Sequence, residues 1–521
     1  MDDRQPDTRT YRFGPLERRG IVGGLRLGQL AVLAAAAAVA VIAFRVAPGG
    51  RGLLLGLLLV AGAAMVAFVP IRGRSLDAWA PVLARWMRLS SLGGASYRSA
   101  QPWTGVAGSL DGSELRRELD LPEALEGCEI VSVPVADGRE VGVFRDPALG
   151  ALTAVLAVRV RAFGLLGETE QERRLERWGQ VLAGLARNQT PVRRVGILER
   201  TVPSDGDDLQ RYLVEARDRE LPAADPALRS YEALLDSAGH VTQDHELFVA
   251  LQIDERKAWA RAGRLARDRA RGRDEIARGV LVRELGTFAT RFDPSDVVVE
   301  GALNARMLAR AIRLGFDPYG RERMNRLATA APELDGADPA VCGPTAADVA
   351  WSSYRTDGAV HRTYWVAQWP RLSVGPTFLS PLLLDGQAVR SVAIVLEPIA
   401  PNRARREVES QITTDEADEQ LRAERGFRTT ARQRRREHAT RERERELADG
   451  HQEVRFAAYV TVSARDEDEL EVACDRIEQA AQQAHLDLQV MWGEQDLAFT
   501  HGALPIARGM VDDAPLGGGW W

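Results

Sequence analysis

Two long apolar stretches near the start of the chain constrain its fold more than any other feature. Leu27 to Phe44 is 18 residues long and Leu53 to Ile71 is 19 residues long, and neither contains a charged side chain. About 20 helical residues span a hydrocarbon layer of about 30 Å, whereas runs of about 10–14 residues are typical of buried core helices. A short segment with one Pro and several Gly joins the stretches. The pattern therefore predicts a transmembrane hairpin over residues 27–71.

The first stretch also allows a second interpretation. It is rich in Ala, which contributes little to membrane insertion, and arginines precede it, so a cleaved signal peptide is an alternative. We favour the hairpin because another apolar stretch follows almost at once and because the first stretch is long for a signal core.

The arginines that flank the hairpin predict its orientation, because Lys and Arg next to membrane segments are retained in the cytoplasm. The tip carries only Arg45 and Arg51. The flanks carry Arg9, Arg12, Arg18, Arg19, Arg26, Arg72, Arg74, Arg85 and Arg88. We therefore expect a multi-pass protein of the cell membrane (inner or plasma membrane) whose N- and C-termini are cytoplasmic. The rest of the chain after Ile71 would form a tethered cytoplasmic body.

An amphipathic segment follows the hairpin at residues 75–90. Its apolar residues recur at the spacing of one helix face, with two arginines at the edge of that face. This pattern predicts a helix that lies in the membrane interface, and a helix packed on the soluble body is the alternative. The apolar face comprises Trp79, Val82, Leu83 and Trp86. The predicted membrane-interface residues are Trp79, Arg85, Trp86 and Arg88.

Charge and motif content exclude several functions. The chain has 521 residues, enough for two or three domains beside the hairpin, and its net charge of -6 gives no reason to expect bulk nucleic-acid affinity. Lys257 is the only lysine, and it lacks the preceding glycines of a phosphate-binding loop. The sequence has no G-x-S-x-G, H-E-x-x-H or G-x-G-x-x-G motif. We therefore predict no enzyme activity, no catalytic residue and no cofactor.

The cysteines and histidines do not suggest a metal site. Cys128, Cys342 and Cys474 lie far apart, and the seven histidines are scattered, so neither set has the spacing of metal ligands. Isolated thiols are typical of a reducing compartment, in agreement with the predicted topology.

The cytoplasmic body alternates β-rich and helical segments, which predicts an α+β fold. We expect a mixed α/β body that consists of two similar halves. Gly239-His240 precedes a predicted strand much as Gly450-His451 precedes another, which suggests the similarity. A proline-rich stretch at 331–344 is the expected boundary. The predicted regions are an N-terminal cytoplasmic segment 1–26, the hairpin 27–71, the interfacial helix 75–90, a first α+β domain 113–330, a second α+β domain 345–509 with a charged helical arm 402–449, and a flexible tail 510–521.

The arm has an unusual composition, with a cluster of arginines followed by alternating Arg and Glu. Several arginines in one patch could neutralise phosphates, so nucleic-acid contact is one interpretation. Acidic residues are interleaved throughout, however, and no aromatic residue alternates with the arginines for base stacking. We therefore favour a solvated helical arm and do not expect direct nucleic-acid binding.

Two parts of the sequence resemble known families. Tyr11 to Gly20 (YRFGPLERRG), the two apolar stretches and Leu76 to Trp86 (LDAWAPVLARW) resemble actinobacterial membrane proteins of conjugative elements, and are similar to PrgI-like and VirB-type membrane subunits of type IV secretion systems. Glu168 to Val202 and Val389 to Arg508, ending in Leu504 to Gly509 (LPIARG), look like the non-catalytic N-terminal domain of VirB-type conjugation ATPases. In that family a comparable Leu-Pro stretch leads into the motor domain, which this sequence lacks.

The resemblance implies a structural membrane subunit that docks a separately encoded secretion or conjugation ATPase at the cytoplasmic membrane face. Its implied partners are membrane lipid, that ATPase and other membrane subunits of the machine, and homo-oligomerisation is compatible with them. One alternative is a type VII secretion membrane subunit of the EccE kind, which also pairs two N-terminal spans with a soluble domain. Another is a membrane-bound enzyme without a recognised motif.

Overall fold

The computed structural model describes residues 27–99, 120–203, 225–263, 272–292, 297–330, 335–424 and 431–510, apart from breaks of one to three residues within these ranges. The described chain forms two compact units, which we call the sheet unit (95–405 and 447–509) and the hairpin unit (up to residue 94, with 406–446). The predicted segment 1–26 and nearly all of the predicted tail 510–521 lie outside the described residues.

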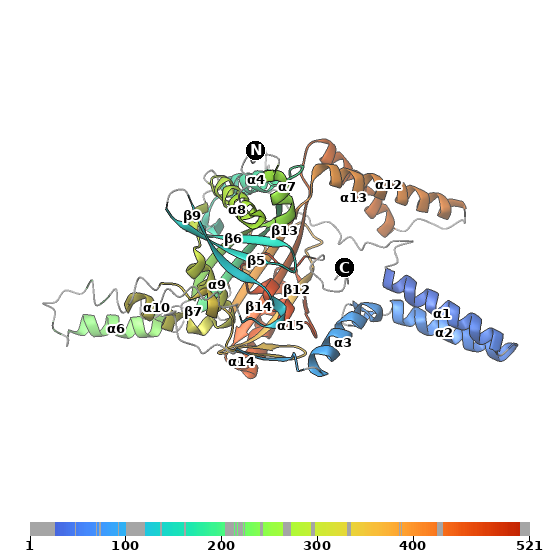
Figure 1. Cartoon of the computed structure of the whole chain (residues 1–521), viewed down its shortest axis with the longest axis horizontal. Helices are drawn as coiled ribbons and strands as arrows, with labels where there is room; N and C mark the ends of the chain where they lie inside the picture. The colour runs from blue at the N-terminus through green and yellow to red at the C-terminus, as the bar shows by residue number, and fades with distance from the viewer. Residues whose placement is uncertain are drawn as a thin grey trace, which may run out of the picture. The chain divides into compact units, whose positions relative to one another are not determined.

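The sheet unit is built on one antiparallel sheet, in which the structure describes 13 strands (Figure 1). This architecture confirms the predicted α+β class, and the two predicted domains share this single sheet. The strands are β3 (Ser96–Arg98), β4 (Glu129–Pro134), β5 (Glu140–Asp146), β6 (Ala151–Val160), β7 (Val192–Pro203), β8 (Gln243–Asp254), β9 (Val297–Ala302), β10 (Ala346–Val349), β11 (Tyr354–Arg355), β12 (Val360–Gln368), β13 (Val389–Pro398), β14 (Val454–Ala464) and β15 (Asp487–Val490).

The strand order has an internal symmetry. From one edge to the other it runs β3-β10-β11-β12-β14-β13-β7-β8-β6-β5-β4. Apart from the edge strand β3, each strand of one half of this path has a counterpart at the mirrored position of the other half. The two strands off this path obey the same rule, because β9 pairs with β6 and β15 pairs with β12. The symmetry centre lies between β7 and β13, which pair antiparallel with Ile197 opposite Ile394. We call Glu129–Arg321 the first repeat and Ala346–Arg508 the second repeat.

Each repeat contains a four-stranded β-α-β-β-α-β arrangement. Its strand orders, β9-β6-β8-β7 and β15-β12-β14-β13, correspond to the fourth, first, third and second strand of the repeat, which is the ferredoxin-like order. The helices of the first repeat are α4 (Glu168–Ala183), α6 (Pro226–Gly239), α7 (Glu255–Gly263), α8 (Arg273–Ala289) and α9 (Ala305–Phe316), and α10 (Arg321–Ala330) follows. Those of the second repeat are α11 (Ser380–Leu383), α12 (Pro401–Glu424), α13 (Ala431–Ala448), α14 (Glu467–Gln483) and α15 (Gln495–Gly502).

Three apolar clusters fix the sheet between its helices. Phe288 of α8 and Leu251 of β8 belong to one cluster, and Ile477 of α14 and Val460 of β14 belong to a second. The third cluster contains α9 and α15 of the two repeats, whose Phe316 and Phe499 rings have centroids 4.9 Å apart. The alternation of side chains along each strand explains this division, because successive residues point to opposite faces.

Both repeats carry a long insertion between their second and third strands. In the first repeat Pro203 pairs with Gln243, and in the second Pro398 pairs with Val454. Each insertion therefore leaves the sheet and returns to it at directly opposed residues. The predicted arm 402–449 is the second of these insertions and is helical, as α12 and α13.

The hairpin unit begins with α1 (Leu27–Val46) and α2 (Gly50–Phe68), which contact each other along their lengths (Figure 1). A two-stranded ribbon of β1 (Pro70–Ile71) and β2 (Arg74–Ser75) leads into α3 (Leu76–Ser91). Helix α2 thus has the expected 19 residues but begins and ends three residues earlier than predicted, since Pro70, which lacks the N–H that a helix interior requires, lies in β1. Within the part of the chain that the structure describes, no helix combines the length and the apolar character needed to cross a membrane.

Candidate functional site

Small and polar side chains lie between the two helices of the hairpin. A Cβ on Gly56 would lie 3.4 Å from the Cβ of Ala40, so the backbones approach closely at this point. Near the open end, the Gln29 side-chain amide donates a hydrogen bond of 2.8 Å to the carbonyl of Ala67. Close approach through Gly and Ala and a satisfied amide between helices are features of helix pairs that form in an apolar medium.

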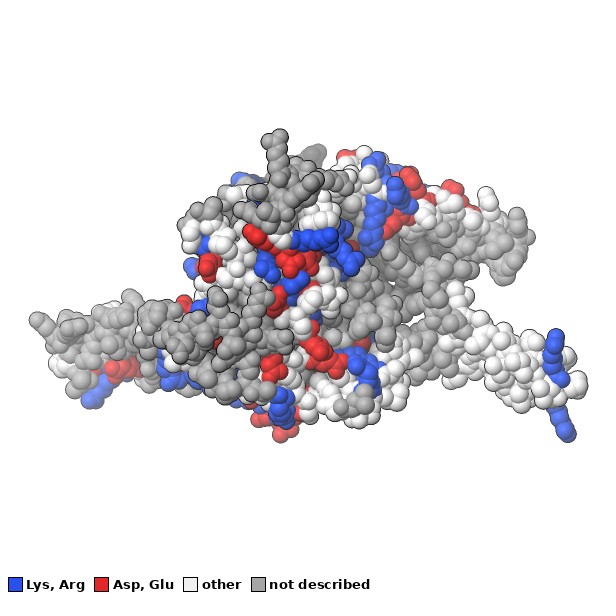
Figure 2. All heavy atoms as spheres, viewed as in Figure 1, with Lys and Arg blue, Asp and Glu red and all other residues white. Residues whose placement is uncertain are grey.

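The outer surface of the hairpin is apolar. Among the described residues of α1 and α2, fourteen large hydrophobic side chains are exposed, including Val46 at 80% and Leu57 at 70%. Figure 2 shows this surface as almost entirely uncharged, with Lys or Arg side chains only at one end, and Arg45 and Arg51 are the only charged residues in the two helices. Soluble monomers rarely expose a continuous apolar patch of this extent. The surface is therefore suited to burial in an apolar environment.

Helix α3 packs one face against this hairpin. Trp79, Val82 and Leu89 are buried, and α3 contacts both α1 and α2. The guanidinium carbon of Arg74 lies 5.4 Å from the ring centroid of Trp79, within the range of a cation–π interaction. Among the described side chains of α3, the large apolar ones that are exposed are Leu83 and Met87, at 42% and 61%.

The four predicted interface residues therefore do not share one environment. Trp79 and Arg85 are buried, Trp86 is half-buried and Arg88 is exposed. Leu83, which the helical spacing places on the Trp79 face, is 42% exposed, whereas Arg85, expected at the edge of that face, is buried. Contact with the membrane interface stays a prediction for all four residues.

Two segments of the sheet unit share a pattern that was not predicted from the sequence. Helix α9 is followed by G-x-x-P-x-x-R at Gly315–Arg321, and α15 is followed by G-x-x-P-x-x-R at Gly502–Arg508. We call them the first and second crossing segments. They occupy equivalent positions in the two repeats. The repeated G-x-x-P-x-x-R pattern could have shown from the sequence that these segments are related. The Gly-His pairs mark only the start of one strand in each repeat, β8 and β14.

The first crossing segment contacts the second repeat. The carbonyl of Phe316 accepts hydrogen bonds from Thr356 Oγ1 (2.5 Å) and from His361 Nε2 (3.3 Å). The Tyr319 hydroxyl donates to the carbonyl of Ser463 at 3.4 Å. At the end of the segment, Arg321 returns to the first repeat and pairs with Asp244 at 2.6 Å.

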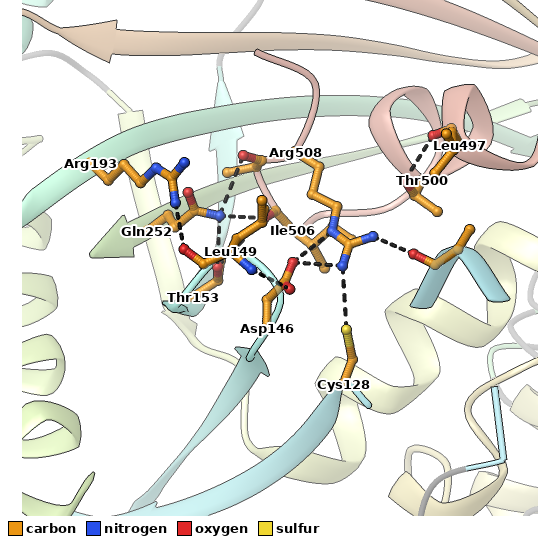
Figure 3. Close-up of polar contacts among 12 residues, drawn as sticks. Cys128, Asp146, Leu149, Thr153, Arg193, Gln252, Leu497, Thr500, Ile506 and Arg508 are labelled. Carbon is orange, nitrogen blue, oxygen red and sulfur yellow. Dashed lines mark hydrogen bonds and ion pairs between the residues drawn. The ribbon is translucent and has the colours of Figure 1, made fainter. Parts of the chain in front are cut away.

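The second crossing segment contacts the first repeat (Figure 3). The Gln252 amide of β8 donates hydrogen bonds to the carbonyls of Ile506 (3.2 Å) and Ala507 (3.4 Å). Arg508 then forms an ion pair with Asp146 at the end of β5, with an Nη2–Oδ2 distance of 2.6 Å. Each repeat thus places its crossing segment on the other repeat.

Each of the three guanidinium nitrogens of Arg508 has a hydrogen-bond acceptor. Its Nε donates to Asp146 Oδ2 (2.7 Å), its Nη1 to the carbonyl of Ala124 (2.5 Å) and its Nη2 to Cys128 Sγ (3.3 Å). Asp146 is 2% exposed and Arg508 is 9% exposed at the side chain, so the pair is shielded from water. Burial raises the pKa of the Cys128 thiol to about 12, although Arg508 opposes this effect. The thiol is therefore protonated and protected.

His361 is another buried polar group of the crossing region. Its Nδ1 lies 2.8 Å from Ser463 Oγ and its Nε2 lies 2.9 Å from Thr356 Oγ1. Burial lowers its pKa to about 3, against a smaller opposing effect of the Phe316 carbonyl. The imidazole is neutral at physiological pH, and its hydrogen bonds account for a structural role.

The arm is held together near its base. Val408 and Thr440 are buried, and Arg443 Nη1 donates to Gln411 Oε1 at 3.4 Å between α12 and α13. Most of its described charged side chains are exposed, with both signs interleaved.

No group of three potential metal ligands occurs among the described residues. The lone lysine, Lys257, lies exposed in α7, where its backbone N–H donates to Asp254 Oδ1 at the helix start. A scan against models of known protein families found no match, and no curated protein sequence matches the chain.

Proposed function

We propose that the chain is a membrane-anchored structural subunit of a conjugative or type IV-like secretion machine, which docks a separately encoded ATPase at the cytoplasmic face of the membrane. The observation that carries this proposal is the α1–α2 hairpin, whose exterior is apolar and exposed and whose few charges lie at one end. Transfer of apolar surface out of water is favourable by roughly 25 cal/mol per Å², which gives the hairpin a strong preference for lipid.

The proposed topology places both ends of the hairpin in the cytoplasm and its tip across the membrane. The flanking arginines support it, because positive side chains near membrane segments stay on the cytoplasmic side. Arg45 and Arg51 at the tip would lie in the far headgroup layer, which long basic side chains reach readily.

The docking role rests on the resemblance of the second half to the N-terminal domain of conjugation ATPases. Surfaces joined covalently in that family would be joined here by an interface, of about 1,200–2,000 Å² or more in a stable complex. The continuous sheet supports such a role, since it provides a rigid platform that carries two helical insertions.

A fractionation and co-purification experiment tests the proposal. The full-length protein should sediment with membranes and capture a secretion ATPase encoded nearby. A chain lacking residues 1–89 should remain soluble and still capture the ATPase, but should not support DNA transfer. A truncated protein that is folded yet captures no ATPase, while transfer still needs the full chain, would refute the docking role.

A further inference from the structure

The second crossing segment lies against the first repeat, through contacts of the kind that a peptide-binding site makes. Gln252 donates to two of its backbone carbonyls, and Thr153 Oγ1 lies 3.5 Å from one of them, the Ile506 carbonyl (Figure 3). Hydrogen bonds to main-chain carbonyls hold a peptide irrespective of its side chains, while separate pockets supply specificity. Gln252 and Thr153 both project from neighbouring strands, and they are 1% and 0% exposed.

The specificity element among these contacts is the set of acceptors for Arg508. Asp146 supplies the charge, and Cys128 Sγ and the Ala124 carbonyl accept the remaining guanidinium donors. An arginine whose three guanidinium nitrogens each find an acceptor is bound by geometry as well as by charge. Lysine could not make this set of contacts.

Gly196 of β7 makes room for the second crossing segment. A Cβ at this position would lie 3.0 Å from the Cβ and 3.1 Å from the Cα of Ala507. The glycine therefore allows the segment to approach the sheet at the symmetry centre. Ala507 itself has a φ of 54°, in the left-handed region that costs free energy for a residue with a Cβ. The equivalent position of the first crossing segment is Gly320.

We propose that Cys128, Asp146, Thr153, Gly196 and Gln252 form a binding site for a P-x-x-R peptide in the bent conformation of the second crossing segment. Its resident ligand is the second crossing segment, which leaves and re-enters this site as a unit while the sheet stays folded. The site takes the same peptide in trans when the resident segment is weakened. The strained backbone at Ala507 favours departure, and the buried Asp146–Arg508 pair favours return.

The native cysteines report on this exchange in the full-length chain. Cys128 touches Arg508, whereas Cys474 lies in the apolar cluster of α14 on the other repeat. Both thiols are buried, so a maleimide labels each only when its surroundings open. We expect Arg508→Ala to accelerate labelling of Cys128 at least tenfold and to leave the Cys474 rate unchanged. Arg321→Ala, which removes the equivalent arginine of the first crossing segment, should leave the Cys128 rate near that of the parent chain.

Two further measurements separate exchange from simple loss of the side chain that covers Cys128. Gly196→Ala should also accelerate Cys128 labelling, since it displaces Ala507 and leaves Arg508 intact. In the Arg508→Ala chain, a synthetic peptide with the sequence of Gly502–Gly509 should restore protection of Cys128, and the same peptide with Ala in place of Arg should not. Parallel acceleration of Cys128 and Cys474, no acceleration in Gly196→Ala, or no protection by the peptide would each overturn the proposal.

Discussion

At the residue scale, the interior of the sheet unit contains polar groups that are buried and hydrogen-bonded. His361 is the clearest case, because a fully buried imidazole with a pKa near 3 must stay neutral in the folded state. Its ordinary pKa of about 6.5 returns on unfolding. Between these two values the unfolded chain binds the extra proton, so stability rises with pH across this window.

This linkage gives a pH-dependent prediction. The contribution of His361 should be fully present above about pH 6.5 and should be lost as the pH falls towards 3, by up to about 4 kcal/mol. The His361→Gln chain should be less stable than the parent at pH 7 but should lose less stability between pH 7 and 4. Urea unfolding midpoints at several pH values measure the difference. Equal slopes for both chains would show that His361 is not the titrating group.

Close packing at a glycine gives a second residue-scale prediction. A Cβ on Gly502 would lie 2.3 Å from Thr461 Oγ1 and 3.1 Å from Thr363 Cγ2, which the sheet cannot accommodate without shifts. Gly502→Ala should therefore lower the free energy of unfolding by about 1–3 kcal/mol. Gly375 has no heavy atom near the position of a Cβ, so Gly375→Ala is the matched control and should be close to neutral. Chemical denaturation of the two variants measures the contrast.

At the scale of elements, some strands could be predicted closely from the sequence, whereas a helix that is buried on nearly all sides could not. The strand predicted at Val192 to Val202 and the one predicted at Val454 to Ser463 match β7 and β14 within one residue at either end. Helix α15 was missed because nearly all of its residues are buried, so it has no solvent-exposed face to create a helical period. The burial of individual side chains of α3 could not be predicted from its own periodicity, because that pattern does not say which neighbouring helices contact it.

The charged arm gives an element-scale prediction. Because Pro398 and Val454 are directly opposed across β13 and β14, a short Gly-rich turn in place of residues 402–449 should close the hairpin. Thermal unfolding of the sheet unit should then change by only a few degrees, since the described charges of the arm are largely exposed. A large loss of stability would show that α12 and α13 are part of the core. If the arm contacts a partner, capture of that partner should fall while the fold persists.

The exposed side of α3 gives a second element-scale prediction. Leu83 and Met87 are the exposed large apolar side chains among the described residues of α3, so changing both to Gln should weaken membrane association without loosening the hairpin. Trp79→Ala should instead destabilise the packing of α3 on α1 and α2, by roughly 3 kcal/mol for a buried aromatic side chain. Sodium carbonate extraction and limited proteolysis of α3 distinguish the two effects. If Trp79→Ala instead weakened membrane association and the Leu83 and Met87 changes instead loosened the hairpin, the Trp79 face would be the one that contacts lipid.

At the scale of the whole sheet unit, the β7–β13 ladder joins the two repeats. The sequence had suggested that the two halves are similar through the Gly-His pair that each of them contains. The ladder runs from Arg390 opposite Thr201 to Leu396 opposite Val195, and each crossing segment adds contacts in the other direction. The pairing of distant strands could not be predicted from local sequence, because periodicity specifies which face of a strand is buried and not which strand lies beside it.

This arrangement predicts that the two repeats unfold together. Phe288→Ala in α8 and Ile477→Ala in α14 each remove a fully buried side chain from a different repeat, at a cost of about 2–5 kcal/mol. If the continuous ladder and the crossing segments couple the repeats, each substitution should raise hydrogen exchange equally in β6–β8 and in β12–β14, because both report one global opening. Exchange measured by mass spectrometry on full-length protein would resolve the two groups of peptides. Faster exchange confined to the substituted repeat would mean that the ladder breaks between β7 and β13, and that the repeats are separate cooperative units despite their shared sheet.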